Sequence, residues 1–598
     1  MPTVQDEIDT SEPPVSVPDT GDTGESGKIK MIVSLVKKCF GVKDIASMRL
    51  SLPASLLEPI PNLEYWHYLD RPDLFAAVND SEDPFERMIA VLRFTFSKDL
   101  KFIHGKVCKP YNSVLGEHFR AHWDVMPVTY PEANRLRPPV QHLYLAPAAA
   151  ESVYSTMEGS SIKSGVSEAS RKSIGARSSG ATSRASGSGT TRTGTPTPST
   201  PATSAIEEQL DAELAHLTLD SNSPSTAQLD DEKLKGLPGN ASVSSVQLIE
   251  ADSPTSSPVV ASAGPRRVRT SYLTEQISHH PPVSAYYASC PSRQVAMCGI
   301  DQISAKVSGT TVRVAPGSCN KGIFLFLENR TGAGGERERY HINHPPAHVN
   351  GILRGSFYIT VSESTIITCT GGNGWTIPGG RYKGTTVGLR AVIDFKEESW
   401  IGKPHFAIEG VVHTYDLTDT GNDRDGWQSW TRVKHVPKER VVASITGSWR
   451  HLIKYKLNPA FFPPPSQSST PRSPVSPTSS SLSLPLDEWV SLLDLSTLYP
   501  IPKLVRDLSK QQEKESRLMW QIVTEKLLSK EYSEANKAKH AIEQRQREEE
   551  AARKLRGEKY VPKYFVWDED TGIPVLTDAG VNALEEEMKE EAVHPIEQ

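Results

Sequence analysis

The feature that most constrains this chain is a long stretch, residues 266–450, in which short apolar runs alternate with turn-forming residues. At its start, Val268, Thr270 and Tyr272 alternate with side chains of the opposite face. Further runs occur at residues 322–327, 356–361, 365–370, 388–396 and 405–415. Many short runs punctuated by Gly, Asn and Asp are typical of strands joined by turns. The sequence therefore predicts an antiparallel sheet or barrel, and it shows no repeat that would indicate a solenoid or propeller.

Other segments lack the apolar residues that a core needs. Residues 1–27 are acidic, residues 149–264 are rich in Ser, Thr, Gly, Ala and Pro, and residues 462–484 are rich in Pro and Ser. Such segments cannot bury enough apolar surface to offset the entropy of ordering, so all three are expected to be disordered. Strand-like sequence flanks residues 149–264 on both sides, which places this insert at a hairpin tip. Residues 571–598 are expected to form an acidic tail.

The rest of the chain is expected to fold in three parts: a mainly helical part at residues 28–148, a β core at residues 265–461 and a charged helical part at residues 485–570. Near the start, apolar residues match one helical face: Ile32, Leu35, Val36 and Cys39. With lysines nearby, this helix either touches a membrane surface or packs on the core. The pair Asp83 and Pro84 predicts the start of a second helix.

Charge and cysteine usage exclude several classes of protein. The formal net charge of −6 does not favour nucleic-acid binding, which calls for a basic patch. The six cysteines form no CxxC pair, so reduced thiols in a cytosolic protein are expected rather than a zinc site of that type. No apolar run is long enough for a membrane-spanning helix. Residues 1–27 have no apolar centre and do not resemble a secretory signal.

The most informative motif is EQISHHPP at residues 275–282. Adjacent strand side chains point to opposite faces, so His279 and His280 can serve one ligand only if the backbone leaves strand geometry there. Pro281 and Pro282 favour such a break, because proline fixes φ and restricts the residue before it. A nearby phosphate would favour protonated imidazoles, which makes an anion site one interpretation. A buried structural histidine and a solvated loop are the alternatives.

Two further motifs carry cations. In KPYNSVLGE at residues 109–117, Lys109 supplies a point charge for phosphate and Asn112 can donate to an oxygen atom. Near the C-terminus, three charged residues spaced by four share one helical face: Lys539, Glu543 and Arg547. Taken alone, each motif has a simpler interpretation, namely a solvated lysine and an ordinary surface ladder of ion pairs.

Taken together, the motifs resemble the oxysterol-binding-protein-related family. Residues 275–282 resemble the family's fingerprint. The other matching motifs follow in the family's order: residues 109–117, GILRG at residues 351–355, ITGSW at residues 445–449, and the helix with Lys539, Glu543 and Arg547. The resemblance spans roughly residues 45–148, 266–460 and 485–570, which is most of the chain that is expected to be ordered.

The resemblance implies a mainly β fold with α-helices: a large incomplete antiparallel β-barrel around a lipid tunnel, an N-terminal lid and a C-terminal helical subdomain. It implies that the tunnel mouth binds the headgroup of phosphatidylinositol 4-phosphate. His279 and His280 would hold the inositol phosphate, and Lys109 and Asn112 would contact headgroup or backbone phosphate. The basic wall would be completed by Lys539, Glu543 and Arg547. Leu57 would lie at the lid side of the tunnel.

The function implied by the resemblance is lipid transfer. Phosphatidylinositol 4-phosphate would be exchanged for a second lipid between membranes, with no cofactor, metal or catalytic residue. Phosphatidylserine is favoured as this second lipid and sterol is next. The Gln-Tyr pair that assists sterol binding has no clear match near Lys101 and Phe102, and the spacing from Arg87 to Lys109 is more like that of the phosphatidylserine group. The expected location is cytoplasmic and peripheral, at the endoplasmic reticulum, other membranes or their contact sites, with transient membrane surfaces as partners.

This chain departs from the family pattern in two ways. Tyr111 and Ser113 stand where the family more commonly has Phe and Pro, which leaves Lys109 and Asn112 unchanged. Residues 149–264 replace a short connection. We find no pleckstrin-homology region and no ankyrin repeats, so the resemblance is to the short members.

Two rival functions fit parts of the sequence. An enzyme that uses His279 or His280 with a metal is disfavoured, because the sequence contains neither HExxH nor GxSxG. A phosphoinositide-dependent sterol sensor or scaffold, which recruits protein partners through residues 149–264, stays open and is compatible with transfer.

Overall fold

The computed structural model describes the following residues: 15–16, 25–39, 42–45, 50–51, 54–104, 108–142, 144, 266–308, 311–352, 357–397, 404–418, 426–463, 486–567, 570–592 and 596. The chain divides into two units, one of which comprises Met1–Ala150 and Leu234–Gln598 and the other Glu151–Lys233. Every described residue lies in the first unit.

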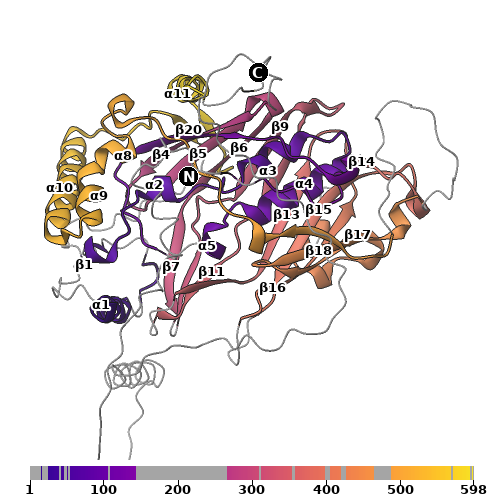
Figure 1. Ribbon diagram of the computed structural model, residues 1–598, viewed down its shortest axis with the longest axis horizontal. Helices are drawn as coiled ribbons and strands as arrows, with labels where there is room; N and C mark the ends of the chain where they lie inside the picture. Colours follow the sequence, from indigo (N-terminus) through magenta and orange to yellow (C-terminus); the bar gives the residue numbers. More distant parts are fainter. Residues whose placement is uncertain are drawn as a thin grey trace, which may run out of the picture. The chain divides into compact units, whose positions relative to one another are not determined.

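A 13-stranded antiparallel sheet organises this unit (Figure 1). Its strands lie in the order β19 (Val490–Asp494), β18 (Leu452–Leu457), β17 (Val441–Ser448), β16 (Ala407–Tyr415), β15 (Thr386–Phe395), β13 (Ser364–Thr370), β10 (Arg337–Ile342), β9 (Ile323–Thr331), β6 (Val295–Asp301), β5 (Val283–Cys290), β4 (Val268–Ser278) and β3 (His118–Val125), with β14 (Trp375–Thr376) beside β15. Within the described residues the edge strands β3 and β19 do not pair with each other, so the barrel is incomplete. The predicted fold class, mainly β with α-helices, is confirmed.

A smaller sheet carries the first helix. It has four antiparallel strands, β12 (Tyr358–Val361), β11 (Ala347–Asn350), β8 (Thr311–Pro316) and β7 (Ile303–Ser308). Helix α1 (Glu25–Lys38) contributes Val36 to an apolar cluster that also contains Cys39, Val307 and Ile352. Of the two interpretations of this helix, packing on the body of the protein is the observed one.

One face of the main sheet is covered by helices because its strands place apolar side chains there at every second position. Leu325, Ile367 and Leu389 share one buried cluster with residues of α4 (Pro84–Ser97). Helix α4 begins as predicted: the Asp83 side chain accepts hydrogen bonds from the backbone N–H groups of Phe85 and Glu86, and Pro84 occupies the first turn. Figure 1 shows α4 beside the shorter helix α3 (Pro72–Ala76), whereas the short helices α2 (Asn62–Tyr65) and α5 (Lys101–His104) lie apart from α4.

The long insert connects two strands that are neighbours in the sheet. Strands β3 and β4 pair in an antiparallel register from His118 opposite Glu275 to Val125 opposite Val268. This pairing confirms that residues 149–264 join the two arms of a hairpin. The predicted disorder of this insert lies outside the described residues.

The structure moves several of the expected boundaries. Helix α1 begins within residues 1–27, which were expected to be disordered. Strand β1 (Val15–Ser16) of the same segment pairs with β2 (Leu50–Ser51). Phe462 is buried in the main core, so the second insert starts later than expected, and most of it lies outside the described residues. Strand β19 belongs to the main sheet, although it lies in the part expected to be helical.

The expected acidic tail at residues 571–598 is wrong for most of its length. It contains β21 (Pro574–Leu576), which pairs with β20 (Phe565–Trp567), and α11 (Asp578–Met588). Ala583 and Leu584 are buried in a cluster with Leu273 of β4. Buried Glu587 contacts His122 Nδ1 at 2.7 Å and Arg506 Nη2 at 2.9 Å. Acidic composition suggested a tail, but Arg506 and His122, from distant parts of the sequence, contact a buried carboxylate of this helix.

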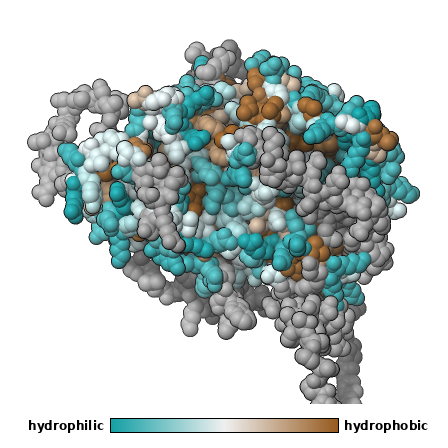
Figure 2. All heavy atoms as spheres, turned by 180° about the vertical axis from the view of Figure 1, so that it is seen from behind, coloured by the Kyte–Doolittle hydropathy of each residue, from teal (hydrophilic) through white to brown (hydrophobic). Residues whose placement is uncertain are grey.

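The surface of this unit is largely hydrophilic in the view from behind, and its apolar side chains gather mainly in the upper half (Figure 2). Within the described residues, no helix has the length and apolar character needed to cross a membrane.

Candidate functional site

A buried tyrosine, Tyr111, anchors the loop at residues 109–117 to the body of the protein. The Tyr111 hydroxyl lies 2.9 Å from Thr524 Oγ1, and its ring packs at 4.9 Å on Trp520. The Tyr111 N–H donates to the Ile60 carbonyl. These contacts hold the backbone of the loop, from which the Asn112 side chain points to solvent. A phenylalanine at this position would lack the hydroxyl that bonds to Thr524.

Lys109 and Asn112 are the exposed side chains of this loop. The Lys109 ammonium donates to Asn112 Oδ1 at 2.6 Å and to the Pro110 carbonyl at 3.1 Å. Solvent still reaches this side chain, but protein atoms crowd it. The resulting desolvation, together with the nearby Lys539 ammonium, lowers the pKa of Lys109 to about 8.

The two histidines lie in the turn between β4 and β5. Strand β4 ends at Ser278 after a register shift, and the Ser278 hydroxyl donates to the Pro281 carbonyl at 2.8 Å. The imidazole rings of His279 and His280 lie 4.4 Å apart between centroids. The predicted departure from strand geometry is confirmed, and it places the two imidazoles next to each other.

Helix α10 (Tyr532–Arg556) supplies the third motif. Lys539 is only 3% exposed, and its ammonium pairs with Glu543 Oε1 at 2.6 Å. Arg547 is exposed and forms no ion pair within the described part of the chain. The interpretation as an ordinary surface ladder is therefore wrong for Lys539, which faces the body of the protein.

Backbone contacts bring the three motifs together at one end of β4. The Gly116 N–H donates to the Gln276 carbonyl at 2.9 Å, which joins the lysine loop to the strand that leads into the histidine turn. The Leu115 N–H donates to Gln546 Oε1 of α10 at 3.1 Å. The electrostatic effect of Lys539 on Lys109 shows that these two cations are also near each other.

Leu57 lies on the helical side of this assembly. It follows a short 3₁₀ helix (Ala54–Leu56) and packs, half-buried, against the cluster that contains Tyr111 and Trp520. Its expected place at the lid side of a tunnel stays a prediction, since residues 46–49 and 52–53 lie outside the described part.

Sequence reasoning assigned no role to two buried carboxylates that hold the site in place. Glu117 accepts hydrogen bonds from Ser516 Oγ at 2.7 Å, from Trp520 Nε1 at 3.1 Å and from the Val114 N–H at 3.0 Å. Burial raises the pKa of Glu117 to about 7 against the effect of these donors. In the sequence, the only sign of this role was that the acidic Glu117 directly precedes a strand with apolar residues.

Glu275 is the second of these buried carboxylates, and it holds the C-terminal segment by accepting hydrogen bonds. Its carboxylate accepts hydrogen bonds from the Tyr560 hydroxyl and from the backbone N–H groups of Lys563 and Tyr564, each at 2.8 Å. This first residue of the fingerprint is fully buried, so its role is to attach residues 560–564 to β4.

The arrangement is suited to binding an anion. The partly desolvated Lys109 ammonium, near a second ammonium that Glu543 already pairs, would be stabilised by a negatively charged ligand. Imidazoles that gain protons near such a ligand add to this effect. Within the described residues, no three His, Cys, Asp or Glu side chains are placed to hold a metal ion.

Comparisons with known proteins agree with the motifs. A family model described as oxysterol-binding protein matches residues 31–156 and 265–588. Oxysterol-binding protein-like protein 1 of Schizosaccharomyces pombe is 35% identical over 95% of this chain and 93% of that protein. Oxysterol-binding protein-related protein 11 of Homo sapiens is 26% identical over 55% of this chain and 34% of that protein.

Two solved structures are similar at lower identity. The Osh1 ORD domain in complex with cholesterol has a TM-score of 0.47 and 16% identity, over 94% of this chain and 89% of that chain. The Osh3 ORD in complex with PI(4)P from Saccharomyces cerevisiae has a TM-score of 0.44 and 11% identity, over 94% of each chain. The match of the family model over most of this chain, and the close relative along nearly its whole length, show that the chain belongs to the oxysterol-binding protein family.

Proposed function

We propose that this protein transfers lipids between membranes, binding phosphatidylinositol 4-phosphate at the site of Lys109, His279, His280 and Lys539. The observation that carries the proposal is the convergence of three cation-bearing segments, with the partly desolvated Lys109 near Lys539. Membership of the oxysterol-binding protein family supports a lipid as the ligand.

The headgroup chemistry matches this set of donors. A phosphate monoester carries a charge of about −1.5 to −2 near neutral pH and has three acceptor oxygens, so it needs several donors at once. Lys109 and Asn112 supply donors from one loop, and the histidine turn supplies two more. Asn112 Oδ1 already accepts from Lys109, which leaves its amide N–H groups for the ligand.

Exchange requires an enclosed space for the acyl chains. Exposing a chain of about 16 carbons to water costs roughly 13 kcal/mol at ~0.8 kcal/mol per CH₂ group. A single lidded tunnel would remove this cost and would admit only one lipid at a time, which makes two lipids compete. We assign phosphatidylserine as the second lipid, with sterol as the other candidate.

Extraction also requires contact with a membrane surface. Exposed apolar side chains lie next to the segment that Glu275 attaches: Val561 is 79% exposed, and Val566 and Val575 are each 63% exposed and stand opposite each other in β20 and β21. Lys559, which lies in the sequence between the end of α10 and Val561, is also exposed. Apolar side chains beside a basic one suit a shallow contact with an anionic bilayer.

The direct experiment is mass spectrometry of lipids that co-purify with the full chain, followed by transfer between vesicles. We expect phosphatidylinositol 4-phosphate together with phosphatidylserine, and phosphatidylserine should move only when the phosphoinositide is present in the opposite vesicle. If sterol co-purifies in place of phosphatidylserine, sterol is the second lipid. The absence of any bound lipid, together with no transfer, would refute the proposed function.

Headgroup affinity should depend on the charge of Lys109. Its pKa of about 8 means that the ammonium is present below pH 8 and is lost as the pH rises through that value. Affinity for soluble inositol 1,4-bisphosphate should therefore fall about tenfold between pH 7 and pH 9, in calorimetric titrations. Arginine keeps its charge across this range, so Lys109→Arg should lose clearly less affinity than the original protein, with the remaining pH dependence coming from the imidazoles of His279 and His280. Identical pH profiles for the two proteins would contradict a role for the Lys109 ammonium.

Removal of the long insert separates transfer from scaffolding. We expect that deletion of residues 150–262 leaves transfer between vesicles within about twofold of the full chain, because the insert only joins β3 to β4. A variant with a Gly/Ser linker of equal length in its place is the matched control. If both variants fold but lose transfer, the insert itself is required, which favours the scaffold function.

A further inference from the structure

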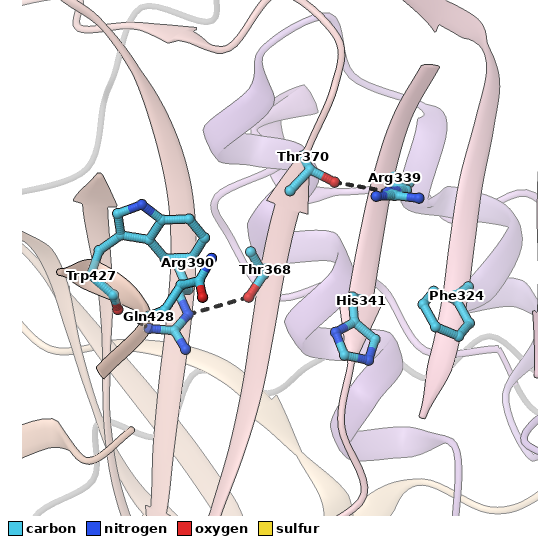
Figure 3. A pocket seen from close by; sticks show the side chains of 8 residues that line it. All are labelled: Phe324, Arg339, His341, Thr368, Thr370, Arg390, Trp427 and Gln428. Carbon is cyan, nitrogen blue, oxygen red and sulfur yellow. Dashed lines mark hydrogen bonds between the residues drawn. The ribbon is translucent and has the colours of Figure 1, made fainter. Parts of the chain in front are cut away.

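A second cationic pocket lies on the opposite face of the main sheet from α4. It has a volume of about 370 Å³ and is formed by side chains of β9, β10, β13 and β15 and by the segment at residues 427–428 (Figure 3). Its polar lining is Arg339, His341, Thr368, Thr370, Arg390 and Gln428, with Trp427 at one side. None of the described lining residues is acidic.

Strand register brings these side chains into one row. Tyr340 and Ile367 point into the core, so their neighbours along the strands point to the outer face. His341 stands opposite Thr368, and Thr368 stands opposite Arg390. Because neighbouring strands are about 4.8 Å apart, the backbones of His341 and Arg390 lie only about 10 Å apart.

Arg390 is the unusual member of this row. It is 5% exposed, and its guanidinium donates to Thr368 Oγ1 at 3.2 Å and to the carbonyls of Trp427 at 2.5 Å and Trp430 at 3.2 Å. Within the described residues it meets no carboxylate, and its Nη2 forms no hydrogen bond. Burial lowers its pKa to about 10, which still leaves it charged at neutral pH.

The other lining groups are oriented to add donors. Arg339 Nε donates to Thr370 Oγ1 at 3.0 Å, as Arg390 does to Thr368 (Figure 3). Since each threonine oxygen already accepts from an arginine, its own hydroxyl proton is available to a ligand. His341 stacks on Phe324 at 4.9 Å, and its Nε2 donates to the Lys321 carbonyl. This hydrogen bond leaves Nδ1 as the other ring nitrogen of His341 that a ligand can contact.

We propose that this pocket binds a small molecule through a phosphate group, independently of the headgroup site. A buried guanidinium without a counter-ion is costly, and a phosphate between Arg339 and Arg390 would supply that counter-ion. Planar guanidinium groups match phosphate oxygens in pairs. A volume of about 370 Å³ is near the lower end for small-molecule sites, which favours a compact ligand over a peptide segment. The phosphate comes either from a soluble phosphorylated compound or from the headgroup of a lipid in a membrane.

The test uses the full chain and two probes: glycerol 3-phosphate followed by calorimetry, and phosphatidylcholine vesicles with about 10% phosphatidic acid followed by co-sedimentation. Whichever of the two probes binds the original protein, Arg339→Gln should weaken its binding about tenfold or more, because one charge-assisted contact is lost. Arg390→Gln should weaken it further, with unfolding curves to check its fold. Arg337→Gln, an exposed arginine on the same strand, is the matched control and should bind as the original protein does.

Each outcome decides the proposal. Loss of glycerol 3-phosphate binding in Arg339→Gln identifies a soluble source, and loss of vesicle binding alone identifies a lipid source. The proposal is overturned if Arg339→Gln binds both probes as tightly as Arg337→Gln does. It is also overturned if His279→Ala with His280→Ala, but not Arg339→Gln, removes binding, or if the original protein binds neither probe.

Discussion

Replacement of both His279 and His280 by alanine is expected to reduce extraction of phosphatidylinositol 4-phosphate from vesicles about 100-fold or more, while the protein stays folded. Two protonated imidazoles would form charge-assisted hydrogen bonds to the phosphate, each contributing about 1.5–3 kcal/mol. Loss of both therefore weakens binding by about 3–6 kcal/mol. Extraction into the protein is measured by the depletion of labelled lipid from sedimented vesicles.

The fold should survive because both histidines lie in the turn after β4 ends, outside the paired positions of the sheet. His435→Ala with His451→Ala is the matched control, since both of these histidines are exposed and far from the site in the sequence. It should extract lipid as the original protein does. If the variant with both His279 and His280 replaced extracts lipid normally, the two histidines do not bind the headgroup. The proposed phosphatidylinositol 4-phosphate site would then be wrong.

Replacement of Glu275 by alanine is expected to destabilise the protein by about 3–5 kcal/mol. The change leaves three donors without their acceptor: the Tyr560 hydroxyl and the N–H groups of Lys563 and Tyr564. Each buried donor that loses its partner costs about 1–3 kcal/mol, and water that reaches Tyr560 recovers part of this cost. The midpoint of urea unfolding gives the change in stability, and limited proteolysis should cut near residues 557–563 first.

Glu409→Ala is the control for this substitution. Glu409 is an exposed residue of β16 that pairs with Lys396, directly after the end of the neighbouring strand β15, so its loss should change stability by less than about 1 kcal/mol. If Glu275→Ala unfolds at the same urea concentration as Glu409→Ala, the attachment of residues 560–564 to β4 does not depend on this carboxylate. A stable Glu275→Ala that fails to extract lipid would instead indicate a direct role in binding.

Much of the fold could be predicted because it depends on local patterns. The period-two runs between turn residues predicted the antiparallel sheet, and the Asp83-Pro84 pair predicted the start of α4. The paired histidines before two prolines predicted a break in the strand, which the turn after Ser278 confirms. Each of these features is set by a few neighbouring residues, so the sequence displays it directly.

The features that sequence reasoning missed depend on contacts between distant segments. Leu115 and Gln546 are 431 residues apart, and Glu275 and Tyr564 are 289 apart. The acidic residues after position 571 suggested a tail, because the partners of Glu587, His122 of β3 and Arg506, lie far away in the sequence.

By itself, then, the sequence determined the family, the sheet and the two residues of the histidine turn, since local spacing and a specific motif are enough for these. Only the tertiary structure decided that Lys539 is buried near Lys109, that Glu275 holds the C-terminal segment, and that Arg390 lines the same pocket as Arg339 and meets no carboxylate among the described residues. The physical reason is that the energy of a charge depends on its burial and on which charges lie near it, and both are properties of the packed chain.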